Sequence, residues 1–326
     1  MTIKTELTEM LGIDYPVIMA PMFLVSNVAM VNEARKAGIT GAIPALNYRT
    51  DADFRAALEE LRKAGDKPFG INLIVNKSNY RLKEQLQTCV DFKVDFIITS
   101  LGNPAGVIDA CKPHGMKVFC DVTEETYAEK VTKLGADALI AVNNRAGGHA
   151  GKLPPETLIP LLKNHSDLPV ISAGGVGDGQ GLHEMLTLGA CGISMGSPFI
   201  ASSEAPVTEA YKEACVTYGA DDIVMTDKLS GTPCTVINTP YVREIGTNQS
   251  WLESVLNKNR TLKKYAKMLT FYKGMKSLEK AAFGATYKTM WCAGPSIEHV
   301  REVRPVKEIV GALISEYDQV VKAHAG

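Results

Sequence analysis

Short runs of apolar and β-branched residues alternate with amphipathic stretches along the first two-thirds of the chain. Eight such runs are candidate strands, at residues 17–22, 41–44, 69–73, 94–99, 117–122, 138–142, 169–173 and 192–195. Between them, segments such as 51–67 and 125–137 repeat apolar residues at helical spacing, and Gly65 or Gly135 closes the helix. The pattern predicts a regular alternation of strand and helix.

Strands that are apolar on both faces and separated by helices indicate a parallel sheet, and eight repeats favour a closed barrel over an open sheet. We therefore predict an α/β protein with a (β/α)8 TIM barrel formed by residues 1–205 and 300–326. Residues 206–299 break the repeat and include the turn-rich segment 230–240 and both tryptophans. We expect an inserted, mainly helical lid or substrate domain there, after strand eight. Residues 305–323 carry one apolar face and predict the helix that closes the ring.

Composition narrows the classes of partner. The 35 basic and 36 acidic residues give a formal net charge of -1, with no basic stripe for nucleic acid. The seven cysteines form no C-x-x-C pair, which is typical of free thiols in a reducing compartment, and no apolar run has the length of a signal peptide or membrane span. We expect a cytoplasmic protein without contacts to nucleic acid or membrane. The histidines and acids lack the spacing of metal ligands, so no metal site is expected.

Three glycine-rich segments follow the last three predicted strands, at residues 143–153, 172–181 and 195–199. In such barrels the loops after strands seven and eight commonly bind a phosphate, because glycines let the backbone N–H groups approach it. Gly174, Gly175, Gly196 and Ser197 are the candidates, although glycines also serve tight turns alone. His149 lies between glycines in the first segment, where it can act as an acid or base, or cap a turn.

These residues resemble the nitronate monooxygenases, formerly called 2-nitropropane dioxygenases, within a wider group of NAD(P)H-dependent flavin reductases. The resemblance rests on APM at 20–22, GINL at 70–73, DVT at 121–123, AGGHAG at 146–151, AGG at 173–175 and MGSPF at 195–199. It implies FMN at the barrel mouth, with His149 as the catalytic histidine. The implied phosphate contacts are Ala173, Gly174, Gly175, Gly196 and Ser197, and the implied ring contacts are Pro21, Met22, Phe23, Asn72 and Gly147.

The side-chain chemistry agrees with a flavin. Backbone N–H groups near Met22 are placed to bond the flavin N5, and the Asn72 amide has the donor and acceptor that a pyrimidine edge needs, unless Asn72 is only a turn residue. Asp121 departs from the pattern, because some relatives have a lysine there. We expect Asp121 either to bond a ribityl hydroxyl or to cap the following helix together with Thr123.

Other residues are less specific. Cys120 and Cys191 are interpreted as packing residues, since no neighbouring sequence signal would activate a thiolate. The segment 286–296 resembles a loop that reaches back toward the flavin in this group. Its members Tyr287, Lys288 and Trp291 are candidates for substrate contact, with lid-core packing as the alternative.

Three functions remain open. The first is FMN-dependent oxidation of alkyl nitronates with O2, in which His149 removes the α-proton of a nitroalkane or, as imidazolium, holds the nitronate anion. The second is NAD(P)H-dependent reduction of quinones or enoyl thioesters by the same flavin. The third is a phosphate-binding barrel without redox chemistry. We favour the first, with a homodimer expected only because homo-oligomers are common.

Overall fold

A computed structural model describes residues 2–229, 233–247 and 290–325. Within it the predicted runs form a closed parallel barrel in the order β1-β2-β3-β4-β5-β6-β8-β9. The ring closes where β9 pairs with β1, with Ile18 opposite Ser194. The barrel strands are β1 (Val17–Met19), β2 (Thr40–Pro44), β3 (Gly70–Ile74), β4 (Phe96–Ser100), β5 (Lys117–Val122), β6 (Ala138–Val142), β8 (Val170–Ala173) and β9 (Gly192–Met195). The predicted (β/α)8 barrel is confirmed.

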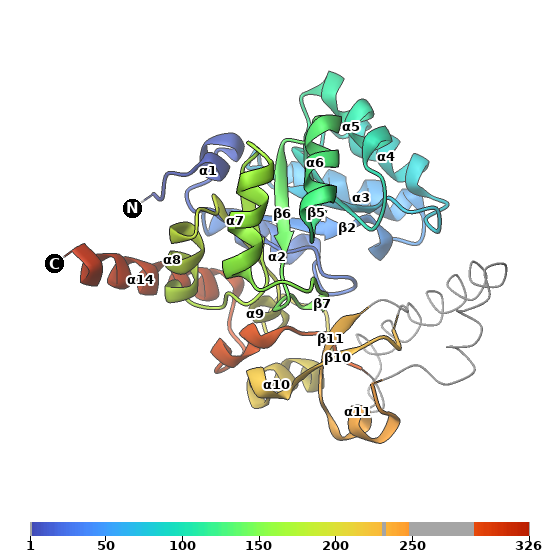
Figure 1. Ribbon diagram of the computed structural model, residues 1–326. Helices are drawn as coiled ribbons and strands as arrows, with labels where there is room; N and C mark the ends of the chain where they lie inside the picture. Colours follow the sequence, from blue (N-terminus) through green and yellow to red (C-terminus); the bar gives the residue numbers. More distant parts are fainter. Residues whose placement is uncertain (1, 230–232, 248–289, 326) are drawn as a thin grey trace.

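A helix follows each barrel strand, and the helices surround the barrel (Figure 1). They are α2 (Val28–Lys36), α3 (Asp51–Lys63), α4 (Leu82–Asp91), α5 (Ala105–Cys111), α6 (Glu125–Leu134), α7 (Pro155–His165), α8 (Gly179–Thr187), and α9 (Ser197–Ile200) after β9. The long C-terminal helix α14 (Val306–Ala325) packs against α8 and α2, which confirms that it completes the helical ring. Among the described residues, no helix is long and apolar enough to cross a membrane.

Large apolar side chains fill the barrel at the N-terminal end of its strands. Helix α1 (Glu6–Leu11) inserts Leu7, and the stacked rings of Phe96 and Phe119 lie 5.1 Å apart between their centroids. All three side chains are fully buried, and truncating such a ring in a core costs about 3–5 kcal/mol. This end of the barrel is therefore a closed core, and any cavity must lie at the C-terminal ends of the strands.

Residues after β9 form a smaller lobe at that C-terminal end (Figure 1). Its described elements are α10 (Glu209–Thr217), β10 (Ile223–Thr226), β11 (Cys234–Ile237), α11 (Pro240–Ile245) and the short helices η3 (Ala220–Asp222) and η4 (Pro295–His299). β10 and β11 are antiparallel, and β11 also pairs with β7 (Gly148–His149) from the loop after β6.

This small sheet was not predicted from the sequence. The segment 230–240 is not only a turn, because the β-branched run 235–237 continues a strand that begins at Cys234. The described part of the insertion contains more helical than strand residues, and the two strands β10 and β11 are an addition to the prediction. Within the described residues, the lobe is joined to the barrel by a β-ladder.

Candidate active site

A cavity of about 1160 Å³ lies between the C-terminal ends of the barrel strands and the lobe. Its wall includes Met22 after β1, Ser100 at the end of β4, His149 in β7, and Cys234 and Met290 from the lobe. The predicted site residues all line this one cavity: Pro21, Met22, Phe23, Asn72, Asp121, Gly147, His149, Ala173, Gly174, Gly175, Gly196 and Ser197. The sequence thus located the site, while the role of each residue stays a prediction.

Glycines let the loops after β6, β8 and β9 approach one another closely. Gly174 has φ +114°, and a Cβ there would lie 2.4 Å from the backbone nitrogen of Ala146. A Cβ at Gly147 would lie 2.8 Å from the Ser197 hydroxyl oxygen. No other residue fits without moving backbone, so the floor of the cavity is formed by main chain, which suits the approach of a phosphate group.

Asn143, at the end of β6, holds two of these loops together. Its Nδ2 donates to the carbonyl oxygen of Gly174 at 3.0 Å, and its Oδ1 accepts from the N–H of Arg145 at 2.8 Å. Its side chain is fully buried. Sequence reasoning missed Asn143, because an asparagine ahead of a glycine-rich loop is also typical of an ordinary turn.

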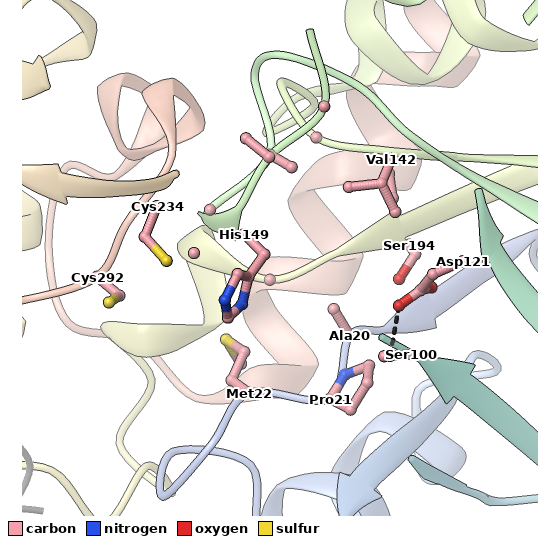
Figure 2. A pocket seen from close by; sticks show the side chains of 18 of the residues that line it. Ala20, Pro21, Met22, Ser100, Asp121, Val142, His149, Ser194, Cys234 and Cys292 are labelled. Carbon is pink, nitrogen blue, oxygen red and sulfur yellow. Dashed lines mark hydrogen bonds between the residues drawn. The ribbon is translucent and has the colours of Figure 1, made fainter. Parts of the chain in front are cut away.

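His149 lies on the cavity side of the barrel–lobe ladder (Figure 2). β7 places it directly opposite Cys234 of β11, and the Thr235 hydroxyl donates to the carbonyl oxygen of Ala146 at 2.7 Å. Burial lowers the pKa of His149 below its ordinary value of 6.5, because the charged form of the ring is poorly solvated there. The imidazole is therefore neutral near pH 7 and can accept a proton.

Another part of the cavity wall is formed by three hydrogen-bonded polar side chains, one each on β3, β4 and β5. Asn72 Nδ2 donates to Ser100 Oγ at 2.7 Å and to the Ile98 carbonyl oxygen at 3.1 Å. Ser100 Oγ in turn donates to Asp121 Oδ2 at 2.5 Å (Figure 2). Burial raises the pKa of Asp121 to about 6, although the hydrogen bond from Ser100 acts in the opposite direction.

This arrangement changes two expectations. Asp121 does not cap α6, whose N-cap residue Glu124 makes no side-chain capping bond. Asn72 does not offer both a donor and an acceptor to the cavity, since both amide hydrogens are used within the barrel. Ser100 was missed because it follows no glycine and carries no motif, and its importance depends on its neighbours on two other strands.

The turn after β1 also differs from expectation. The Met22 N–H donates to Ser26 Oγ at 2.8 Å, and that hydroxyl donates to the Ala20 carbonyl oxygen at 2.9 Å. The Met22 N–H is therefore not available to a flavin N5. β1 itself ends at Met19, three residues before the predicted end, because Pro21 has no N–H with which to continue the ladder.

The lobe contains Tyr211, which the sequence did not single out, and Trp291, which it did. Tyr211 lines the cavity, and its hydroxyl donates to the Cys292 carbonyl oxygen at 2.5 Å. Trp291 stacks on Tyr211, with centroids 5.7 Å apart, and is not part of the cavity wall, so of the two roles considered for Trp291 this packing favours the lid core. Tyr287 and Lys288 lie outside the described residues.

The thiols behave as packing groups. Cys120 and Cys191 are buried, and burial raises the pKa of Cys120 to about 11 and that of Cys191 to about 12. Both remain protonated at neutral pH, which confirms the interpretation that neither is a nucleophile.

Comparison with known proteins places this site in a family. The family model described as "Nitronate monooxygenase" matches residues 4–82 and 79–316. The chain belongs to the nitronate monooxygenase family. The resemblance found in the sequence is thereby confirmed, and the protein is an oxidoreductase of this family.

Curated relatives of this chain carry different names. A Pseudomonas aeruginosa protein named nitronate monooxygenase is 29% identical over 270 residues, which cover 69% of this chain and 77% of that protein. A Rhodococcus jostii protein named (3aS,4S,5R,7aS)-5-hydroxy-7a-methyl-1-oxo-octahydro-1H-indene-4-carboxyl-CoA dehydrogenase is 30% identical over 244 residues, covering 75% of this chain and 68% of that protein.

A solved structure is similar to this chain over its full length. FabK from Thermotoga maritima superimposes with a TM-score of 0.87 at 29% identity, covering 100% of this chain and 99% of that one. Relatives of similar sequence therefore carry different names, and the substrate of this chain must be argued from the cavity.

Proposed function

We propose that this protein is an FMN-dependent nitronate monooxygenase that oxidises alkyl nitronates with O2, and that His149 is its proton acceptor. The observation that supports this most directly is the buried position of His149 in the cavity wall, where burial lowers the pKa of its imidazole. A neutral imidazole can remove the α-proton of a nitroalkane, whereas holding a nitronate anion would need the imidazolium form. Of the two roles considered for His149, the lowered pKa favours the base.

The residues around the cavity fit FMN. Its volume of about 1160 Å³ exceeds the roughly 300–1,000 Å³ typical of a single drug-sized ligand, so it can hold the cofactor and a small substrate. The glycine floor at Gly147, Gly174 and Gly175 admits a phosphate, and Asn72 Oδ1 can accept from an N–H on the ring edge. FMN bound there supplies the electron transfer and the O2 chemistry.

The chain's own residues supply proton transfer and exclusion of water. His149 would take the α-proton, which leaves the nitronate to be oxidised to a carbonyl compound with release of nitrite. Apolar groups of Met22, Leu229 and Met290 line the same cavity and limit hydration of the imidazole. This environment keeps His149 neutral and ready to act as a base.

A split between two substrates tests the role of His149. His149→Asn should lower kcat/KM for a neutral nitroalkane by about 10²–10⁴-fold, the typical contribution of a positioned base. Turnover of the preformed nitronate, which needs no deprotonation, should fall much less. O2 consumption and nitrite release report both reactions, and His183→Asn on the outer helix α8 is the matched control. Equal losses with the two substrates would rule out His149 as the base.

A second candidate is NAD(P)H-dependent reduction of enoyl thioesters or quinones. The size of the cavity favours it, because about 1160 Å³ can hold a substrate larger than a small nitroalkane beside the cofactor. The name of the Rhodococcus jostii relative, a carboxyl-CoA dehydrogenase, also refers to a CoA thioester. NADH oxidation that depends on an added enoyl thioester, with no turnover of nitronates, would favour this candidate.

A further inference from the structure

The hydrogen bonds among Asn72, Ser100 and Asp121 run in one direction only. An ionised Asp121 can only accept, so the single hydroxyl hydrogen of Ser100 is given to Asp121 Oδ2. Ser100 Oγ must then accept from Asn72, which places Nδ2 and not Oδ1 against it.

The backbone favours the same orientation. Asn72 Nδ2 also faces the Ile98 carbonyl oxygen, and a flipped amide would set two acceptors against each other. Both amide hydrogens of Asn72 are thus committed within the barrel. No described residue donates to Oδ1, and the Asn72 side chain lines the cavity while only 7% of the residue is exposed.

We propose that Asp121 and Ser100 are positioning residues that hold Asn72 as an obligatory hydrogen-bond acceptor, so that this part of the cavity selects a cofactor ring edge presenting an N–H donor. The N3–H of the flavin pyrimidine is such a donor, and in this respect the inference rests on the proposed binding of FMN. Asp121 acts through Ser100 on Asn72 in this role. The three residues lie on adjacent strands, so the barrel itself sets their spacing.

The ionised state of Asp121 is consistent with hydrogen bonds that run from Asn72 to Ser100 and from Ser100 to Asp121. Burial raises the pKa of Asp121 to about 6, and the hydrogen bond from Ser100 opposes that rise by stabilising the carboxylate. At pH 8 the carboxylate is the dominant form and accepts from Ser100. The Ser100 hydroxyl then has no hydrogen left with which to turn the Asn72 amide around.

A flavin without the N3–H tests the inference. Apoprotein would be titrated at pH 8 with FMN and with N3-methyl-FMN, and binding followed by quenching of flavin fluorescence. The wild type should prefer FMN by at least about tenfold, because the methylated ring leaves a buried acceptor unpaired. Ser100→Ala should bind FMN more weakly and lose part of this preference, since only the Ile98 carbonyl oxygen then holds the Asn72 amide in its orientation.

Two further variants separate positioning from loss of structure. Ser100→Thr keeps the hydroxyl and should restore the preference for FMN. Ser172→Ala removes a buried serine of β8 that donates to Met185 Sδ and does not line the cavity, and it should leave the preference unchanged. Thermal midpoints of the apoproteins report whether each variant is folded. A loss of folded protein alone would not change the ratio of the affinities for FMN and N3-methyl-FMN.

Each outcome has a distinct meaning. A wild type that binds FMN but does not discriminate against N3-methyl-FMN overturns the inference and leaves the proposed function standing. The same holds if Ser100→Ala keeps the full preference. A wild type that binds neither flavin overturns the proposed function itself.

Discussion

Replacing Gly174 by alanine tests the close packing of the loops on the cavity floor. The backbone at Gly174 has φ +114°, which costs an L-residue roughly 1–2 kcal/mol. The added Cβ would also lie 2.4 Å from Ala146 N and 2.6 Å from Asn143 Oδ1, and overpacking of this kind costs typically 1–3 kcal/mol. We expect Gly174→Ala to lower the free energy of unfolding by about 2–5 kcal/mol.

The assay is urea unfolding of the apoprotein, followed by circular dichroism. Gly106→Ala is the matched control, because Gly106 lies within α5 and a Cβ there meets nothing within 4 Å. Alanine at such a helical position should raise stability by about 0.5–1 kcal/mol. A Gly174→Ala variant as stable as the wild type would refute the packing described for the loops after β6 and β8.

Two further predictions concern stability. Tyr211→Phe removes the hydrogen bond to the buried Cys292 carbonyl oxygen and should lower the free energy of unfolding by about 1–3 kcal/mol, while a chemical denaturation midpoint equal to that of the wild type would argue against this bond. Asp121→Asn should change the pH dependence of stability. The folded pKa of about 6 lies above the ordinary value of 3.8 for an aspartate, so protonation of Asp121 stabilises the fold; this stabilisation is complete below about pH 4 and is lost as pH rises through about 6. Thermal midpoints of wild type minus variant should therefore fall between pH 4 and pH 7, and a constant difference would contradict the raised pKa.

The barrel could be predicted from sequence because its strands and helices carry local signals. The runs at residues 117–122, 138–142 and 192–195 coincide with β5, β6 and β9, since each is a β-branched or apolar run between turn residues. Gly135 ends α6 in the left-handed conformation, as its position in the pattern predicts. The pairing of β7 with β11 could not be predicted, because β7 has only two residues and its partner lies far along the chain.

The sequence predicted those cavity residues that carry a local signal, the glycines and the histidine. It could not predict contacts that depend on hydrogen-bond partners elsewhere in the chain. Gly174 and His149 are recognisable from their neighbours in sequence. The engagement of the Met22 N–H could not be predicted, because its acceptor, the Ser26 hydroxyl, is identified only by the folded turn. The roles of Ser100 and Asn143 depend on atoms of other strands, so neither residue has a local signature.

The most direct test of the proposed function is anaerobic reduction of the bound flavin. Protein reconstituted with FMN would be freed of O2 and mixed with an alkyl nitronate, or in a separate sample with NADH, while the absorbance of the oxidised flavin is recorded. The account predicts that the nitronate bleaches this band and that NADH does not. Rapid bleaching by NADH, with no change on adding nitronate, would contradict it.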